Sequence, residues 1–226
     1  MTTTNAIKDT MTTKTSPKPA HVLREYGPFD GIERVHGVTH DGSLVWFAYG
    51  EKMAAFDPAS GEIAKSIPVA SDAGTAYDGT HLYQLAGEHI QKVEPSTGRI
   101  VATIPAPGGG NDSGMTWADG TLWVGQYKDR SIHQIDAETG AILNTLRSDR
   151  FVTGISWVDG ELWHGTWEND ASEIRRVDPQ SGRVLEALEM PQGTMVSGLE
   201  AKGDVFYCGG GSSGKVRAVR RPTRGK

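Results

Sequence analysis

The sequence predicts an all-β protein: a five-bladed β-propeller of four-stranded antiparallel blades, closed into a ring by an N-terminal strand. The first observation is a segment that occurs five times along the chain, each copy beginning with a glycine. These glycines are Gly37, Gly74, Gly114, Gly154 and Gly198, spaced 37 to 44 residues apart. The second observation is a tight turn containing Asp and Gly shortly after each of them. A repeat of this length with several short strands is typical of propeller blades.

The copy at residues 153–191 shows the four strands of one blade most clearly. The alternating run GISWV, an Asp-Gly turn and the run ELWHGTW predict a β-hairpin. A third run, EIRRV, ends at an Asp-Pro step, where the proline removes a backbone donor and Gly182 follows in a turn. The run RVLEALEM is the fourth strand. Because the other copies repeat this order, we expect the same arrangement in each of them.

We expect the propeller to span residues 21–222 and both ends of the chain to lie outside it. Residues 1–20 are rich in Thr and Lys and contain no apolar secretory segment, which predicts a disordered tail and a cytoplasmic protein. Residues 223–226 are expected to form a short basic tail. The copy that begins at Gly198 has only three strand-like runs, whereas His21–Gly27 alternates like a fourth strand. We therefore expect the N-terminal strand to complete the fifth blade and remove two exposed sheet edges.

Composition narrows the classes of function. The 226 residues fit one domain, and the formal net charge of −5 argues against nucleic acid as the partner. No apolar run reaches 18 residues, so no membrane partner is expected. The one cysteine, Cys208, excludes an internal disulfide and fits a reducing compartment. The sequence requires no cofactor, predicts no metal site and indicates no oligomeric state, so the expected partner is a small-molecule ligand or substrate.

Strand parity predicts which side chains line the central channel. In each first strand, the residue two places after the leading glycine points to the same side as the glycine. These residues are Thr39, Ala76, Thr116, Ser156 and Glu200. Glu200 is the single acid among small residues, which suggests a general base or a cation ligand. The alternative is a solvated acid that is hydrogen-bonded to its hydroxyl neighbours.

The rim of the channel is predicted to consist of the loops before each leading glycine and after each second strand. His36 stands where three other copies have a hydroxyl residue, and it is the histidine best placed for proton transfer. The hydroxyl residues, Ser113, Thr153 and Ser197, are expected to cap turns of neighbouring blades. Aromatic, acidic and amide side chains in these loops suit a small polar ligand. The residues expected to bind it are Tyr49, Asn111, Asp112, Tyr127, Trp167, Glu168, Asn169 and Met195.

The run DGELWHGTWENDASEIRRVDPQSGRV resembles a blade of the plant and bacterial glutamine cyclotransferases, and it is also similar to virginiamycin B lyase-like propellers. Trp167 and Asp170 match the family's Trp-x-x-Asp, which precedes Ile-x-x-Ile-Asp-Pro-x-Thr-Gly. The resemblance implies a five-bladed propeller. The family's carboxylate motifs are not retained, since residues 153–156 read TGIS where the family has Asn-Glu-Leu-Glu. His36 replaces the glutamine of the family's Phe-Thr-Gln-Gly-Leu.

Two functions from different classes fit these observations. The first is an enzyme of lyase, cyclotransferase or hydrolase type that acts on a small polar substrate, with Glu200 and His36 as the proton-transfer groups at the channel. The alternative is a non-catalytic propeller that binds a ligand or a protein. A polar site concentrated at one mouth favours the enzyme, whereas a broad apolar or charged face favours the binding module.

Overall fold

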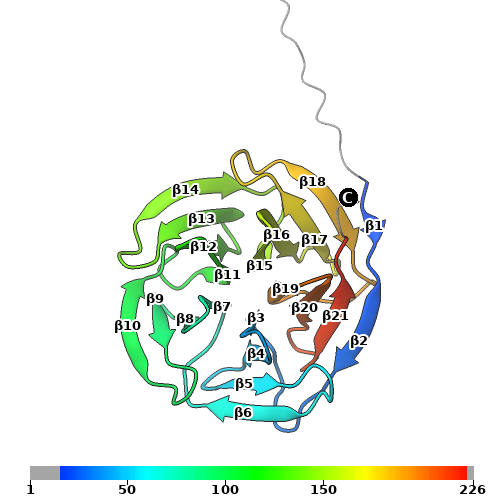
Figure 1. Ribbon diagram of the computed structural model, residues 1–226. Coiled ribbons are helices and arrows are strands. Elements are labelled where there is room, and N and C mark those ends of the chain that lie inside the picture. The colour runs from blue at the N-terminus through cyan, green and yellow to red at the C-terminus, as the bar shows by residue number, and fades with distance from the viewer. Residues whose placement is uncertain (1–15, 223–226) are drawn as a thin grey trace, which may run out of the picture.

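A computed structural model describes residues 16–222, and within this range every regular element is a β-strand. Five sheets surround a central axis, as Figure 1 shows, which confirms the predicted five-bladed propeller. Residues 1–15 and 223–226 lie outside the described part, and with them most of the predicted N-terminal tail and all of the predicted C-terminal tail. No helix capable of crossing a membrane occurs between residues 16 and 222.

Each blade contains four antiparallel strands. Blade 1 consists of β3 (Val38–His40), β4 (Val45–Ala48), β5 (Met53–Phe56) and β6 (Ile63–Ile67). Blade 2 consists of β7 (Thr75–Tyr77), β8 (Leu82–Ala86), β9 (His89–Val93) and β10 (Ile100–Pro105). Blade 3 consists of β11 (Asp112–Ala118), β12 (Thr121–Gln126), β13 (Ser131–Asp136) and β14 (Ile142–Arg147). Blade 4 consists of β15 (Val152–Val158), β16 (Glu161–Thr166), β17 (Glu173–Val177) and β18 (Val184–Glu189). Blade 5 consists of β19 (Leu199–Lys202), β20 (Val205–Gly209), β21 (Val216–Arg220) and β2 (Val22–Tyr26).

The N-terminal strand β2 closes the ring, as the sequence predicts. It pairs antiparallel with β21, from Val22 opposite Val219 to Tyr26 opposite Val216. The same strand also contacts blade 1, because the Tyr26 hydroxyl donates to the Pro58 carbonyl in the β5–β6 turn at 3.0 Å. The sequence reveals this strand because its alternation matches the fourth strand that the last copy lacks.

A short strand precedes β2 and lies within the segment predicted as a tail. This strand, β1 (Lys18–Pro19), pairs in parallel with the outer strand β18 of blade 4, and Ala20 donates to the Glu189 carbonyl at 2.7 Å. Figure 1 shows β1 on the outside of the ring beside β18. Two residues, one of them a proline, carry no alternating pattern, so sequence periodicity cannot reveal such a strand.

The five leading glycines form a tight ring around the axis. A Cβ on Gly74 would lie 2.6 Å from the carbonyl carbon of Gly114, and one on Gly198 would lie 2.9 Å from the carbonyl carbon of Gly37. The Cβ positions of Gly114 and Gly154 likewise overlap the backbone of the next blade. Because inner strands approach this closely only without a Cβ, glycine is required at the start of every first strand.

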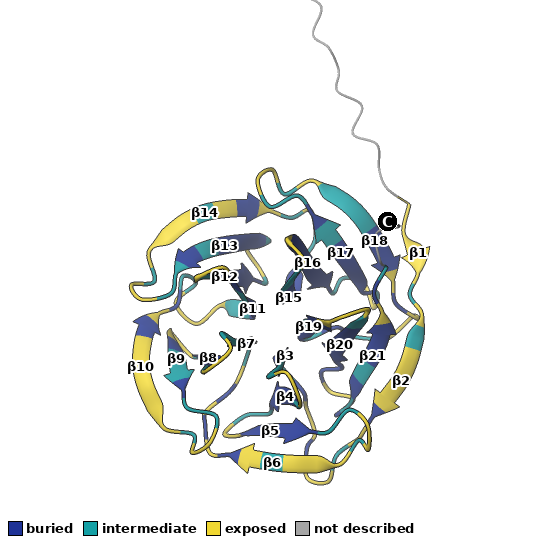
Figure 2. Cartoon of the chain, in the orientation of Figure 1, coloured by how far each residue is buried: buried dark blue, intermediate teal, exposed yellow. Residues whose placement is uncertain are grey.

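The core lies between neighbouring blades. Trp46 of blade 1 and Leu82 of blade 2 belong to one buried cluster, and Tyr83 of blade 2 stacks on Trp117 of blade 3 at 5.4 Å. Burying a side chain such as Leu82 stabilises the fold by about 1.5–3 kcal/mol. Figure 2 shows the complementary pattern on the outside, where strands β6, β10 and β14 are largely exposed. The packed inner strands therefore hold the loops at the channel mouth in fixed positions.

Candidate functional site

A cavity of about 270 Å³ opens at one mouth of the central channel, and we call it the mouth cavity. Its walls come from segments immediately before the leading glycines and from loops after second strands. These segments lie close together because the leading glycines, which have no Cβ, allow all five first strands to approach the axis. The lining residues are His36, Asp72, Ala73, Asp112, Ser113, Tyr127, Thr153, Trp167, Met195 and Ser197.

Asp112 begins β11 and faces the mouth cavity with a partly buried carboxyl group. Both of its carboxyl oxygens accept a hydrogen bond from the Gly108 backbone N–H at 3.0 Å. A Cβ on Gly108 would lie 2.7 Å from Oδ1 of Asp112, so glycine is needed for this close approach. Burial raises the pKa of Asp112 to about 6, although the Gly108 N–H favours the charged form.

His36 lies two residues before β3 of blade 1, and its backbone N–H donates to the Ala48 carbonyl at 2.9 Å. Its imidazole is partly buried on the wall of the mouth cavity. Burial, with a further contribution from the positive charge of Arg34, lowers the pKa of His36, while Asp72 acts in the opposite direction. The imidazole is therefore neutral at neutral pH and available to accept a proton.

Tyr127 is held against the mouth cavity by aromatic stacking. Its ring lies 4.7 Å from that of Phe151 with an interplanar angle of 17°, and its hydroxyl donates to the Trp167 carbonyl at 3.4 Å. The Arg130 guanidinium covers the Phe151 ring at 4.4 Å. Arg130 also pairs with Glu168 at 2.6 Å. The loops of blades 3 and 4 therefore fix the position of Tyr127 together.

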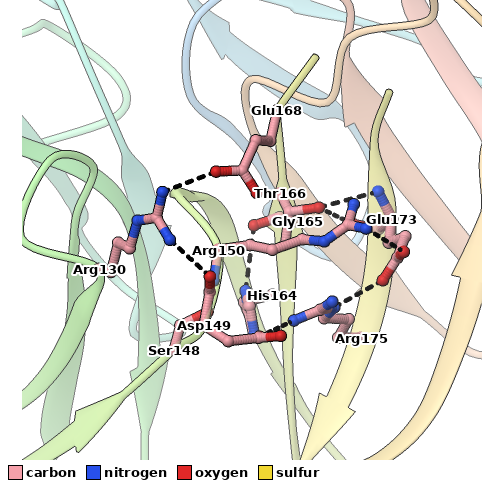
Figure 3. A network of polar contacts seen from close by, with 10 residues as sticks. All are labelled: Arg130, Ser148, Asp149, Arg150, His164, Gly165, Thr166, Glu168, Glu173 and Arg175. Atoms are coloured by element: carbon pink, nitrogen blue, oxygen red, sulfur yellow. Dashed lines mark hydrogen bonds and ion pairs between the residues drawn. The ribbon is translucent and has the colours of Figure 1, made fainter. Parts of the chain in front are cut away.

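A charged network extends from Arg130 into blade 4, as Figure 3 shows. Arg130 donates to the Asp149 carbonyl at 2.7 Å, and the Asp149 carboxylate pairs with Arg175. Arg175 pairs in turn with Glu173 at 2.7 Å, and both of these side chains are buried. Neighbouring His164 is buried, and burial lowers its pKa to about 4, so it adds no charge to the network at neutral pH. Since breaking a buried ion pair leaves an uncompensated charge, the network keeps these loops in a single arrangement.

The hydroxyl residues before the leading glycines mainly join blades. Ser113 donates to the Val152 carbonyl at 2.8 Å, and Ser197 donates to the Val35 carbonyl at 2.6 Å. This agrees with the expected capping of neighbouring blades. Thr153 differs, because its buried hydroxyl forms no hydrogen bond within the described range 16–222. This hydroxyl lies against β16, since a Cβ on Gly165 would be 2.6 Å from Thr153 Oγ1, so it packs between strands and does not face the cavity.

Glu200 lies on β19 beyond the glycine ring and does not line the mouth cavity. It stands three positions after Ser197, which does line the cavity, and three positions correspond to about 10 Å along a strand. Its carboxyl group accepts hydrogen bonds from the Thr39 hydroxyl at 3.0 Å and from the Ala201 N–H at 3.0 Å. A longer contact of 3.5 Å joins it to the Ser156 hydroxyl. Glu200 thus links blades 1, 4 and 5, and burial raises its pKa to about 8.

The structure brings together five of the ten predicted site residues: His36, Asp112, Tyr127, Trp167 and Met195. The other five, Glu200, Tyr49, Asn111, Glu168 and Asn169, are not on the walls of the mouth cavity. Tyr49 instead hydrogen-bonds Ser66 at 3.2 Å, and Glu168 pairs with Arg130. Asn111 and Asn169 are exposed, and Asn169 has a φ of 53° in its turn.

Asp72 faces the mouth cavity although it is not among the predicted binding residues. A signal for it exists in the repeat, because Asp72 and Asp112 both stand two residues before a leading glycine. The equivalent residues of the other blades are Val35, Val152 and Val196. Between residues 16 and 222, no three His, Cys, Asp or Glu side chains lie close enough together to hold a metal ion.

The fold and the site define a five-bladed propeller with a cavity at one mouth of its channel that both polar and apolar side chains line. No protein-family model matches the sequence, and comparison with curated proteins gives no match either. Among solved structures, the glutaminyl cyclase of Myxococcus xanthus is similar with a TM-score of 0.76 and 14% identity, over 92% of this chain and 98% of that one. The virginiamycin B lyase of Staphylococcus aureus is similar with a TM-score of 0.51 and 16% identity, over 88% of this chain and 70% of that one. Both comparisons confirm the predicted resemblance in fold.

Proposed function

We propose that the protein is an enzyme that acts on a small polar molecule by general acid–base chemistry, as a lyase, cyclotransferase or hydrolase. The observation that carries the proposal is the presence of Asp112 and His36 on the wall of one cavity. The pKa of Asp112 is raised to about 6, and that of His36 is lowered from 6.5. Groups whose pKa values lie near the working pH are the most effective proton-transfer catalysts. Two enzymes of similar fold, a cyclase and a lyase, add support.

The two groups fit complementary roles. At pH 7 the neutral imidazole of His36 is a general base. Asp112, with a pKa of about 6, is protonated in about a tenth of the molecules at pH 7, so it can donate a proton and return to the carboxylate. Tyr127 and Trp167 form apolar walls on which a substrate can be oriented.

The charge of the mouth cavity favours a substrate with an amino group. Asp72 and Asp112 line it, whereas no lysine or arginine does. The faces of Tyr127 and Trp167 are electron-rich and attract cations as well. An amine or ammonium group therefore complements this cavity better than an anion does.

Cyclisation of a glutaminyl compound is the first reaction to test. In it, an amine attacks the carbon of a carboxamide, the new C–N bond closes a ring, and ammonia leaves. The attacking nitrogen must lose a proton and the leaving nitrogen must gain one, which matches one base and one acid. We assign the base to His36 and the acid to Asp112.

Glu200 is the second proton-transfer group that the sequence suggests. If it acted on the substrate, Glu200→Gln would lower turnover by roughly 10²–10⁴-fold. We propose instead that Glu200 joins blades, because its hydrogen bonds connect Thr39 with Ser156 at a distance from the mouth cavity. Under this proposal Glu200→Gln lowers turnover by less than about tenfold.

A cytoplasmic location is part of the proposal. The one cysteine of the sequence, Cys208, is buried, and burial raises the pKa of its thiol to about 12. An unreactive, unpaired thiol is compatible with a reducing compartment.

The test compares Asp112→Asn and His36→Gln with a matched control. Each variant should lower turnover by roughly 10²–10⁴-fold while folding normally. Asp119→Asn, in an exposed turn with a φ of 47° that Asn tolerates, should leave turnover unchanged. Activity is measured as ammonia release from a glutaminyl peptide, and then as turnover of a panel of small amines and amides. Binding of these compounds without any turnover would support the non-catalytic alternative, and full activity in both variants would place the chemistry elsewhere.

A further inference from the structure

A second cavity, of about 300 Å³, lies beside the mouth cavity and shares Trp167 and Met195 with it. It is formed between the loop after β16 in blade 4 and the β20–β21 loop of blade 5. Its other lining residues are Asp170, Gly193, Gly210, Ser212, Ser213 and Arg217. We call it the side cavity. Unlike the mouth cavity, it has an arginine on its wall.

Arg217 carries a positive charge that its protein neighbours offset only in part. Its Nε donates to Glu25 at 2.6 Å, but Glu25 also accepts from Lys215 at 2.8 Å. Two cations therefore share one carboxylate, and their hydrogen bonds lower the pKa of Glu25. The Nη1 group of Arg217 is buried and forms no hydrogen bond within residues 16–222. A guanidinium nitrogen in this state gains from an added anionic acceptor.

The β20–β21 loop packs closely against this guanidinium. Gly210 has no Cβ, and a Cβ at this position would lie 2.7 Å from Arg217 Nη1 and closer still to the Ser213 hydroxyl. The glycine thus brings a charged donor and a hydroxyl to one point. Ser212 and Ser213 are exposed at the edge of the cavity. The Ser213 hydroxyl donates to the Gly210 carbonyl at 2.8 Å and can exchange this bond for one to a ligand by rotating about its C–O bond.

We propose that the side cavity binds an anionic group, a carboxylate or a phosphate, with Arg217 as its counter-ion and the hydroxyls of Ser212 and Ser213 as further donors. Because Trp167 and Met195 form walls of both cavities, one small molecule can occupy both. Its amino end would lie near Asp72 and Asp112 and its anionic end near Arg217. This extension to one ligand rests on the proposed function, whereas anion binding at Arg217 does not.

Asp170 is the one carboxylate on the wall of the side cavity. It is exposed to solvent and makes no ion pair with Arg217. Its negative charge opposes anion binding through the cavity. Removing it by Asp170→Asn should therefore strengthen the binding of an anion, which is the opposite of the effect expected at Arg217.

The experiment is an NMR titration of the ¹⁵N-labelled protein with inorganic phosphate and, separately, with acetate at constant ionic strength. The signals followed are the Trp167 indole N–H, assigned with Trp167→Phe, and the Gly210 amide. Both should shift and saturate. Arg217→Gln should weaken binding by about tenfold or more, because a charge-assisted pair is lost. Lys215→Gln is the matched control. Like Arg217→Gln, it removes one positive charge and one hydrogen bond to Glu25, but Lys215 does not line the cavity. It should change affinity by less than about threefold.

Further variants keep the result decisive. If Arg217→Gln alters the spectrum of the whole blade, Gly210→Ala still tests the site, because it retains every charge and sets a methyl group against Nη1 and the Ser213 hydroxyl, which must both move. Tighter binding of phosphate than acetate, or the reverse, identifies which anion the cavity takes. Shifts that never saturate, or equal affinities in Arg217→Gln and Lys215→Gln, would overturn the proposal.

A parallel titration with ethylammonium separates this inference from the proposed function. Asp112→Asn should weaken the binding of ethylammonium, whereas Arg217→Gln should leave it unchanged. If ethylammonium does not bind while phosphate or acetate binds through Arg217, the anion site stands and the proposed amine site fails. The opposite pattern would retain the amine site and refute the anion site.

Discussion

The carboxyl group of Glu200 should make the stability of the propeller depend on pH, and Glu200→Gln should remove that dependence. In the folded protein the group is enclosed by Thr39, Ser156 and the Ala201 N–H, and burial raises its pKa to about 8 from an ordinary value of 4.5. The folded state therefore keeps a proton that the unfolded state has lost between these two pH values. The stabilisation from this proton is complete below pH 4.5 and declines as the pH rises to about 8.

The size of the effect follows from proton linkage. Each pH unit within this window lowers the free energy of unfolding by about 1.4 kcal/mol. Between pH 5 and pH 7, Glu200 should therefore remove roughly 2–3 kcal/mol of stability. Glutamine cannot ionise, and its carboxamide oxygen can still accept from the Thr39 hydroxyl and the Ala201 N–H. Glu200→Gln should thus be less sensitive to alkaline pH than the parent protein.

The measurement is urea denaturation of both proteins at pH 5, 6, 7 and 8. The difference in the free energy of unfolding between them isolates Glu200, because the other titrating groups, such as Asp112, are common to both. Glu138→Gln, in an exposed turn of blade 3, serves as a control for the same chemical change. If the parent protein and Glu200→Gln lose stability in parallel over this range, Glu200 does not hold a proton between the blades.

Two further predictions concern the closure of the ring and its centre. Among the described strands, deleting residues 1–20 removes β1 alone and should change the melting temperature by a few degrees at most, whereas deleting residues 1–28 also removes β2 with Tyr26 and should lower it by more than about 10 °C. Equal melting temperatures for the two truncations, followed by circular dichroism, would contradict closure by β2. Gly74→Ala should destabilise the fold by roughly 2–4 kcal/mol in urea denaturation, because its Cβ would lie 2.5 Å from the Met115 nitrogen. Unchanged stability in this variant would show that the glycine ring can widen without cost.

The blade pattern could be predicted from the sequence because it depends on local chemistry repeated at a fixed spacing. The Asp-Gly turns, the leading glycines and the alternation of short strands all occur within single copies, and β2 was identifiable because one copy lacked a strand. β1 follows a different logic. Its two residues pair through their backbone with β18 of blade 4. Backbone pairing does not require alternating side chains, so the sequence contains no pattern that would predict it.

The candidate site was predictable to the extent that it follows the repeat. His36, Asp112 and Tyr127 meet in the mouth cavity because they occupy loops that the fold places at one end of the channel. Strand parity predicts the side of β19 on which Glu200 lies. It does not predict how far along the channel, away from the mouth cavity, the side chain is placed. Glu168 contacts Arg130 from a different blade, and such a pairing depends on side-chain rotamers that no local pattern records.

The ring of leading glycines also affects how molecules would move through the propeller. Because the backbones of neighbouring inner strands are in contact around the axis, we expect the passage between them to be too narrow for an organic molecule. The mouth cavity would then be a blind pocket with one entrance. A substrate would enter and its product would leave by the same route, so each product molecule must depart before the next substrate can bind. An enzyme built in this way is expected to show competitive inhibition by its product.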